Sequence, residues 1–457
     1  MGIDIGHRYR AAFKKHTNAW GSGLPIALGA GDQLEFNTES LKANVELVMN
    51  EGLYGSAFRR VGSPGNQKPG GDMDFDLYYR DGGGTVGGGH QILALGMGSD
   101  AVTALGGGAH RHDLTLLSNH TGLYGTLVFG SDELVVEHPF AKVSGLKLAW
   151  DQGSQRCKIT PSFIGFEKNV NVGAADATFV VANAAAANGV KTIAAQPPTP
   201  SPLKITLTGV TELITVIVYT NIRGDQVTET HTRSTGGLTY TTLQYAKSAI
   251  SITCSAIAGA GNFQVTTSNG VNNQTTLAAV TTDTFRDPIL FSQGKFNFND
   301  QAGADFVGTD EQFIDSMEMN VNLGMDQRVT SQFGYRIEQP STGGSGRPSA
   351  GLTVKFSALT DRNRRHFWDM VGKAPLKGRA VFTGPQVASS GIAHSLTIYF
   401  NGIQYSGDDP NVGGPGVLPV SFTGEANNAI AAPTGFPGGV IQPVFMQLVN
   451  GLATAII

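Results

Sequence analysis

Alternation of apolar and polar side chains dominates the sequence and predicts β-strands. The segment SLKANVELV, residues 40–48, alternates with a period of two, and so does SMEMNVNLG, residues 316–324. Because successive side chains of a strand point to opposite faces, each segment would present one apolar face to a core and one polar face to water. Helical patterns are confined to short pieces, HQILALGMG from His90 and RRHFWDMVG from Arg364. The pattern therefore predicts a mostly β protein.

These two alternating segments lie 276 residues apart, and the same offset relates His90 to His366 and Gly96 to Gly372. Each segment is followed by a Gly- and Pro-rich loop, a second alternating strand, a short helical piece and two closing strands. A shared order at a shared offset predicts an internal duplication. We place the repeats at 34–169 and 284–425, with an N-terminal arm at 1–33 and a C-terminal arm at 426–457.

A stretch of different composition separates the repeats. The Pro-rich segment NAAAANGVKTIAAQPPTPSPL leads into short runs rich in Thr, Val and Ile, such as ITVIVYTN and ISITCSA. Short strands at 8–12-residue spacing with Gly, Asn and Asp turns predict a small β-sandwich of immunoglobulin-like type. We expect this inserted domain, with its linker, over residues 170–283.

Composition narrows the function classes. Only 15% of the 457 residues are charged, which suits a protein that covers much of its surface in an assembly. A net charge of −4 provides no basic footprint for sequence-specific DNA binding. Cys157 and Cys254 form neither a disulfide framework nor a zinc-binding spacing. No apolar run reaches transmembrane length, and MGIDIGHRYRAAFKKH lacks the apolar region of a signal peptide, so we expect synthesis in the cytoplasm.

Three aspartates are the first candidates for chemistry. Asp72, Asp74 and Asp76 share one face of a predicted strand and could act as an acid–base pair or hold calcium. The second repeat carries no carboxylate set at the matching positions, where Thr353, Lys355 and Ser357 stand. A solvated polar strand face is the simpler interpretation.

Other motifs support catalysis or ligand binding less well. His110 and His112 share a strand face but lack a third ligand at a typical metal-site spacing. GGGTVGGGH, residues 82–90, lacks the Lys-Ser/Thr ending of a phosphate-binding loop. We therefore expect a protein that is not an enzyme and that carries no cofactor and no metal.

At the level of whole segments, the chain resembles the tail tube proteins, or major tail proteins, of long-tailed bacteriophages. The run TNAWGSGLP…GDQLEFNTESLKANVE resembles the start of that family. GLTVKFSALTDRNRRHFWDMVGK is similar to its strand-then-helix segment, and HSLTIYFNGIQYSGDDPNVGGPGVLPVSFTGEAN to its closing hairpin and final strand. The insert resembles the immunoglobulin-like decorations of phage tail proteins. The first repeat departs most, through its DGGGTVGGGH and GGGAHRHD insertions.

The resemblance implies a structural virion protein with two tandem tube-type β-sandwich or barrel domains, each with a short helix. Such subunits join into rings that stack into the hollow tail tube through which phage DNA passes. A duplicated chain would form a homotrimer with pseudo-sixfold symmetry, with a homohexamer as the alternative. The implied partners are further copies of the chain, the tape measure, tail terminator and distal tail proteins, and double-stranded DNA in passage, with no membrane. The implied location is the virion tail.

The resemblance to tail tube proteins also implies roles for two sets of residues. An acidic lining would let DNA slide, because lysine and arginine would retain its phosphates. Asp72, Asp74 and Asp76 are the candidates for this lining. The loops at 59–71 and 336–350, and the hairpin loop DDPNVGGPG, would contact neighbouring subunits. Their candidate residues are Arg59, Arg60, Lys68, Arg336, Arg347, Asp408, Asp409 and Asn411.

Three alternatives stay open. A β-sandwich adhesin would bind receptors or carbohydrate through the insert, where Tyr219, Tyr240 and Tyr245 are the only tyrosines. A polysaccharide-degrading enzyme would use the aspartate strand. The inner tube protein of a contractile tail shares the expected fold, because the sheath is a separate protein.

Overall fold

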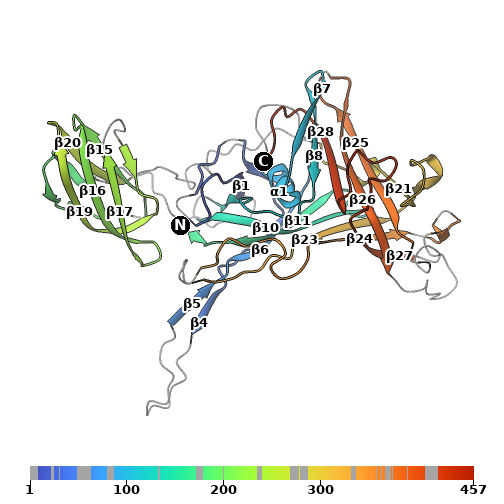
Figure 1. Ribbon diagram of the computed structural model, residues 1–457, viewed down its shortest axis with the longest axis horizontal. Helices are drawn as coiled ribbons and strands as arrows, with labels where there is room; N and C mark the ends of the chain where they lie inside the picture. The colour runs from blue at the N-terminus through green and yellow to red at the C-terminus, as the bar shows by residue number, and fades with distance from the viewer. Residues whose placement is uncertain are drawn as a thin grey trace, which may run out of the picture.

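The structure is a computed structural model, and it is mostly β with several sheets, as the alternation predicts (Figure 1). It describes residues 9–21, 25–29, 31–48, 63–79, 87–131, 134–170, 179–198, 200–233, 239–267, 277, 287–330, 336–356, 358–361, 363–365, 372, 374–388, 390–406 and 420–457. Within these ranges, the helices are all too short or too polar to cross a bilayer.

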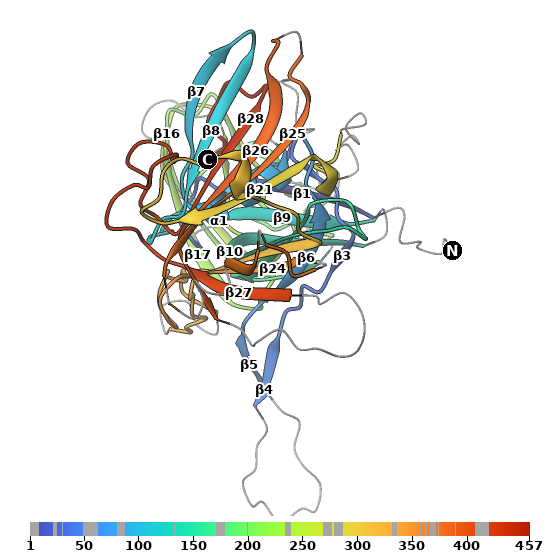
Figure 2. The same ribbon diagram turned by 90° about the vertical axis from the view of Figure 1, so that its right-hand side faces the viewer.

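The first half of the chain folds into a row of antiparallel strands. Its elements are β1 (Arg10–Lys15), β2 (Gln33–Leu34), β3 (Thr38–Glu39), β4 (Val45–Val48), β5 (Ser63–Gln67), β6 (Gly70–Asp76), α1 (Gly88–Met97), β7 (Ala101–Gly106), β8 (Ala109–Thr115), β9 (Gly125–Gly130), β10 (Val135–Asp151), β11 (Lys158–Gly165) and β12 (Asn169–Val170). Paired neighbours follow the order β3, β6, β11, β10, β9, β1 and β2. Strands β4 and β5 form a separate hairpin that projects from the body (Figures 1 and 2).

The second half repeats this order of pairing. Its elements are η2 (Phe291–Gln293), β21 (Gly294–Asp300), η3 (Gly308–Asp310), β22 (Glu311–Gln312), β23 (Ser316–Asn322), β24 (Ser349–Phe356), β25 (Leu376–Gln386), β26 (Ala393–Ser406), β27 (Val420–Ala426) and β28 (Val444–Asn450). Paired neighbours follow the order β23, β24, β27, β26, β25, β21 and β22. Each strand of this row has a counterpart at the same place in the first.

The insert is a sandwich with its own core. Its strands are β13 (Phe179–Ala185), β14 (Gly189–Val190), β15 (Leu203–Thr208), β16 (Glu212–Asn221), β17 (Gln226–Arg233), β18 (Thr239–Thr241), β19 (Ala246–Ala258) and β20 (Asn262–Thr267). They form two four-stranded sheets, ordered β13-β20-β15-β18 and β14-β19-β16-β17. The alternating side chains of β15 and β16 bury one face of each sheet in a separate apolar cluster. Figure 1 shows this sandwich as a lobe beside the body.

The two halves share one core, which differs from the expectation of separate tandem domains. Strand β23 pairs with β10 along its whole length, from Ser316 opposite Asp151 to Asn322 opposite Gly145. This pairing places Leu148 and Met319, each fully buried, in one cluster that runs through both halves. The rings of Trp150 and Phe382 stack across the halves with centroids 4.8 Å apart.

Both predicted arms contribute integral strands. Strand β1 pairs with β2 and β9, and its side chains Ala11, Ala12 and Phe13 are buried. Strand β28 lies between β26 and β8 and so ties the end of the chain to both halves. Burial of these short apolar runs outweighs the cost of ordering the chain ends.

The first predicted helix is α1, and nearly all of its side chains are buried. Its glycines serve close packing, because a Cβ on Gly89 would lie 3.1 Å from the Phe75 ring. Gly98 ends the helix with φ +97°, a conformation that favours glycine. Residues 82–86 of the glycine-rich run, and most of the second predicted helix, lie outside the described residues.

Two histidines are buried in uncharged form. Burial lowers the pKa of His138 to about 3 and that of His120 to about 4, with Lys142 adding to the effect at His120. His120 Nε2 lies 3.2 Å from the Gly96 carbonyl oxygen, at the end of α1. The His138 ring stacks on Phe129.

These histidines predict a loss of stability in acid. Below about pH 6.5 the unfolded histidines bind protons that the folded ones do not, so stability falls as the pH falls toward 4. At pH 5 each should cost about 2 kcal/mol of the free energy of unfolding. Urea unfolding at pH 7 and pH 5 measures this. His138→Gln should reduce the acid sensitivity, whereas His110→Gln, at a partly exposed position, should leave it unchanged; equal sensitivity in both variants would contradict the assignment.

Candidate functional site

The most extensive functional candidate is a polar sheet face that spans both halves. Strands β6, β11, β10, β23, β24 and β27 pair in this order, so their alternate side chains form one continuous surface. The opposite face of the same strands carries the shared core, including Phe75, Leu148 and Val354. The junction of the halves therefore lies in the middle of this face.

Registered rows of polar side chains cross the face from strand to strand. One row places Asp74, Thr160, Lys147, Asn320, Gly351 and Glu425 opposite one another in sequence. The hydroxyl of Thr160 donates to Asp74 Oδ1 over 2.9 Å. Lys147 Nζ lies 2.9 Å from Glu318 Oε2, which bridges β10 to β23 and thus the first half to the second. Such cross-strand pairs stabilise a sheet modestly.

Carboxylates outnumber ammonium groups on this face. The register assigns to it the acidic side chains of Asp72, Asp74, Asp76, Asp151, Glu318 and Glu425, and the lysines Lys147, Lys158 and Lys355. Serine, threonine, asparagine and glycine fill most other positions. The face is thus hydrophilic and net acidic.

The three aspartates predicted to line a lumen all lie on this face, in different environments. Asp72 is exposed, and Asp74 is half-buried beside Thr160. Asp76 is 9% exposed, and its Oδ2 lies 3.0 Å from Arg156 Nη1. Asp76 is therefore neutralised locally, whereas Asp72 and Asp74 contribute charge to the surface.

A small cavity adjoins the buried end of this strand. Glu35, Asp76, Tyr78 and His90 are among its lining residues, and its volume is about 40 Å³. Burial and the neighbouring Glu35 carboxylate raise the pKa of Tyr78 to about 12. The space accommodates water rather than a sugar ring. Among the described residues, no three His, Cys, Asp or Glu side chains gather as a metal site would require.

The residues predicted to contact neighbouring subunits divide into three groups. Arg59, Arg60, Asp408, Asp409 and Asn411 lie outside the described residues. Lys68 forms an ion pair of 3.2 Å with Glu46 across the projecting hairpin, and Arg347 is exposed. Arg336 is only 3% exposed, and its guanidinium group lies beside Glu167 inside the chain instead of facing outward.

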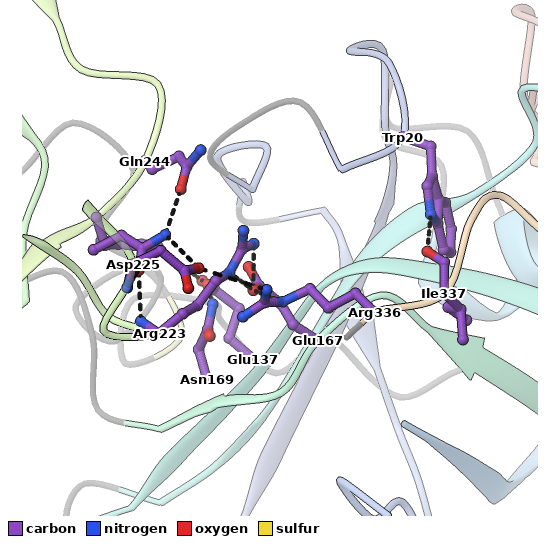
Figure 3. Close-up of polar contacts among 11 residues, drawn as sticks. Trp20, Glu137, Glu167, Asn169, Arg223, Asp225, Gln244, Arg336 and Ile337 are labelled. Atoms are coloured by element: carbon purple, nitrogen blue, oxygen red, sulfur yellow. Dashed lines mark hydrogen bonds and ion pairs between the residues drawn. The ribbon is translucent and has the colours of Figure 1, made fainter. Parts of the chain in front are cut away.

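The loop after β23 was expected to reach a neighbouring subunit, but it is anchored to the first half of its own chain. Trp20 Nε1 donates to the Ile337 carbonyl over 3.2 Å (Figure 3). Lys142 Nζ donates to the Pro340 carbonyl over 2.6 Å, and burial lowers its pKa to about 8. The Thr342 hydroxyl lies 3.3 Å from His120 Nδ1. Among the described residues of this loop, 343–347 is the longest exposed stretch available to a neighbour.

A buried ion cluster joins the insert to the body (Figure 3). Glu167, which follows β11, contacts Arg223 of the insert and lies 3.4 Å from the Nε of Arg336. Both guanidinium groups lie over the Phe166 ring, at 5.1 and 5.8 Å. Charge-assisted pairing of this kind fixes orientation as well as proximity.

Local turn chemistry positions Arg223. Strand β16 ends at Asn221, whose side-chain oxygen accepts from the backbone N–H of Arg223 at 2.9 Å and of Asp225 at 3.0 Å. Asparagine favours such turns because its side chain satisfies nearby backbone donors. The turn holds Arg223 toward Glu167.

A second buried contact lies beside this cluster. The Tyr245 hydroxyl of the insert donates to Glu137 Oε1 over 3.3 Å, and Asn169 Nδ2 lies 3.4 Å from the same atom. Burial, with the Glu137 charge, raises the pKa of Tyr245 well above its usual range. Tyr245 thus fastens the insert, whereas the adhesin alternative would use it to bind carbohydrate.

Sequence reasoning did not identify Glu167, Arg223, Glu137 or Tyr245. Each stands in an ordinary polar or strand context, and its partner is distant along the chain. One usable signal was the NIRGD turn at 221–225, where Asn and Gly predict a tight turn with an arginine at its tip.

Comparisons with known proteins found neither a matching family model nor a matching curated protein.

The ion cluster predicts that Glu167→Gln loosens the insert. The substitution leaves two arginines without their shared carboxylate in a buried site, which typically costs about 3–5 kcal/mol. Denaturant unfolding and limited proteolysis of the connection between insert and body measure the effect. Glu212→Gln, at an exposed position in β16, is the matched control; equal midpoints and digestion patterns for the two variants would contradict the proposed anchoring.

Proposed function

We propose that this protein is the subunit of a hollow tube for the passage of double-stranded DNA, as in the tail of a long-tailed bacteriophage. The observation that carries the proposal is the continuous, hydrophilic, net acidic face that runs across both halves of the chain. Antiparallel sheets commonly keep one face in water, and in a conduit this face would form a wall that stays wet and does not bind its cargo.

The charge of this face fits DNA in transit. Lysine and arginine that neutralise phosphates release counterions and hold the duplex, so a basic wall would retain DNA. Here six carboxylates lie on the face with four cationic groups, those of Lys147, Lys158, Lys355 and Arg156. Lys147 is paired with Glu318 and Arg156 with Asp76. The surface would repel phosphate at short range while the hydroxyl and amide groups keep it hydrated.

The repeated order of strand pairing supports a ring built from repeats. Each chain supplies two equivalent strand sets, so a homotrimer with pseudo-sixfold symmetry is the favoured ring, and a homohexamer is the alternative. Rings that stack head to tail make a contact that does not close on itself, which generates a filament. The sandwich insert, fastened by Arg223 and Tyr245, would decorate the outside of the tube.

Negative-stain electron microscopy of the purified protein tests the proposal. We expect tubes with a regular ring repeat and threefold or sixfold end views. Particles that stay monomeric over all concentrations and salt conditions would refute it. A three-dimensional reconstruction should place β6, β11, β10, β23, β24 and β27 at the inner wall.

Reversing charge on the polar face should make the tube retain DNA. Asp72→Lys with Glu425→Lys adds positive charge at two exposed positions, and binding should weaken steeply as salt increases. Co-sedimentation with short duplex DNA, followed by nuclease digestion, measures DNA protected inside tubes. Glu212→Lys, with its change on the insert, should protect no DNA. Equal protection by both variants, or none in either, would contradict an inner position of the face.

A further inference from the structure

A cleft lies beside the buried ion cluster, with walls from both the insert and the body. Its volume is about 410 Å³, within the range of sites that bind small molecules. The body contributes Gln67, at the end of β5, and residues 167–170. The insert contributes Ile222 and Arg223, in the turn after β16, and Lys247 of β19. Segments far apart along the chain thus meet at this cleft.

Cationic side chains predominate in the lining of the cleft. They are those of Lys168, Arg223, Lys247 and Arg336. Among the described residues of the lining, Glu167 supplies the only carboxylate. Two more carboxylates lie close by, because Asp225 Oδ2 is 3.9 Å from Arg336 Nη1 and Glu137 accepts from Tyr245. Even with these, the four cationic groups outnumber three carboxylates, in a chain whose net charge is −4.

The two arginines form the buried part of the lining. The side chain of Arg223 is 13% exposed and that of Arg336 is 4% exposed. Both meet at Glu167, and both guanidinium groups lie over the ring of Phe166 (Figure 3). The carboxylate and the ring therefore fix the orientation of two planar groups whose donors match the oxygens of phosphate or carboxylate.

The two lysines stand on opposite walls. Lys168 belongs to the body and is half-buried, and its Nζ donates to the Leu41 carbonyl over 3.3 Å. Lys247 belongs to the insert and is exposed, two positions after Tyr245, which reaches the body. Among the described residues, neither lysine forms an ion pair with a carboxylate. Their charges are therefore available to a ligand in the cleft.

This arrangement of charge favours a phosphoryl group as the ligand. Like charges gathered around one cleft repel one another, and a bound anion offsets that repulsion. A phosphoryl group carries up to two negative charges at neutral pH and has three strong acceptor oxygens, whereas a carboxylate carries one charge on two oxygens. The cleft is larger than a phosphate ion, and Val170, Pro200 and Ile222 offer apolar contacts to the rest of a ligand.

We propose that this cleft binds a small phosphorylated ligand. Its phosphoryl group contacts Lys247 and the guanidinium groups of Arg223 and Arg336, and Lys168 contacts it from the opposite wall. The ligand thereby bridges the insert and the body and strengthens the junction that Glu167 and Tyr245 form. This inference concerns a site apart from the polar face and does not depend on the proposed tube.

Titration calorimetry of the full chain with inorganic phosphate tests the site. In a chloride buffer free of other oxyanions, we expect one phosphate bound per chain. Lys247→Glu should weaken binding by at least about tenfold, the effect of losing one hydrogen bond between charged groups. Lys168→Gln should weaken it in the same direction. Lys295→Glu, at an exposed position of β21, is the matched control and should bind as the wild type does.

Three results would overturn the inference. The first is that the wild type binds no phosphate, and the second is that Lys247→Glu and Lys295→Glu bind it equally. The third is tighter binding of malonate than of phosphate, which would assign the cleft to a dicarboxylate.

Melting temperatures in phosphate and in chloride at equal ionic strength provide a second measurement. Phosphate stabilises folded proteins generally, because it is excluded from their surface, so the readout is the difference between variants. The melting temperature should rise less for Lys247→Glu than for Lys295→Glu and the wild type. Equal rises in all three would show general exclusion alone and would contradict the site.

Discussion

The pairing of β10 with β23 is the constraint on which the rest of the structure depends. It joins strands from the two halves along seven registered residue pairs. One side of this ladder supplies the centre of the shared core, where Leu148, Trp150 and Met319 are excluded from water. The other side forms the middle of the polar face. Without the ladder the chain would have two smaller sheets, each with an apolar edge exposed to solvent.

Much of the fold could be predicted from the sequence, because the patterns that indicate strands and helices are local. Alternation predicted the strand at 316–324 and its counterpart at 40–48, and the apolar run after His90 predicted α1. The offset of 276 residues corresponds to strands that take the same place in the two rows. The sequence did not predict which residues distant along the chain contact one another. Arg336 stands in a Gly- and Pro-rich context typical of a mobile loop, but Glu167, distant in sequence, makes it part of the interior. The terminal strands β1 and β28 were assigned to arms because nothing local distinguishes an edge-filling strand from a tail.

A buried lysine in each half holds loops from the later part of the chain by the same physical means. Lys142 donates to the Pro340 carbonyl, and Lys377 donates to the carbonyls of Gly303, Ala304 and Thr434. A buried ammonium group is costly unless backbone oxygens replace its water shell. Three such oxygens surround Lys377, and burial still lowers its pKa. Loops that would otherwise move become fixed parts of the structure, which would suit the proposed tube subunit.

The way the insert closes on itself affects how the chain finds its fold. Strands β13 and β20 are neighbours in one sheet, with Phe179 opposite Thr266, so the insert returns the chain close to where it left. Once the sandwich has formed, its residues no longer add to the length of the flexible connection between β11 and β23. Because loop-closure entropy grows with the logarithm of loop length, this shortening lowers the entropic cost of bringing the halves together by about 1 kcal/mol. Early folding of the insert would therefore speed the slowest long-range step, the docking of β23 on β10.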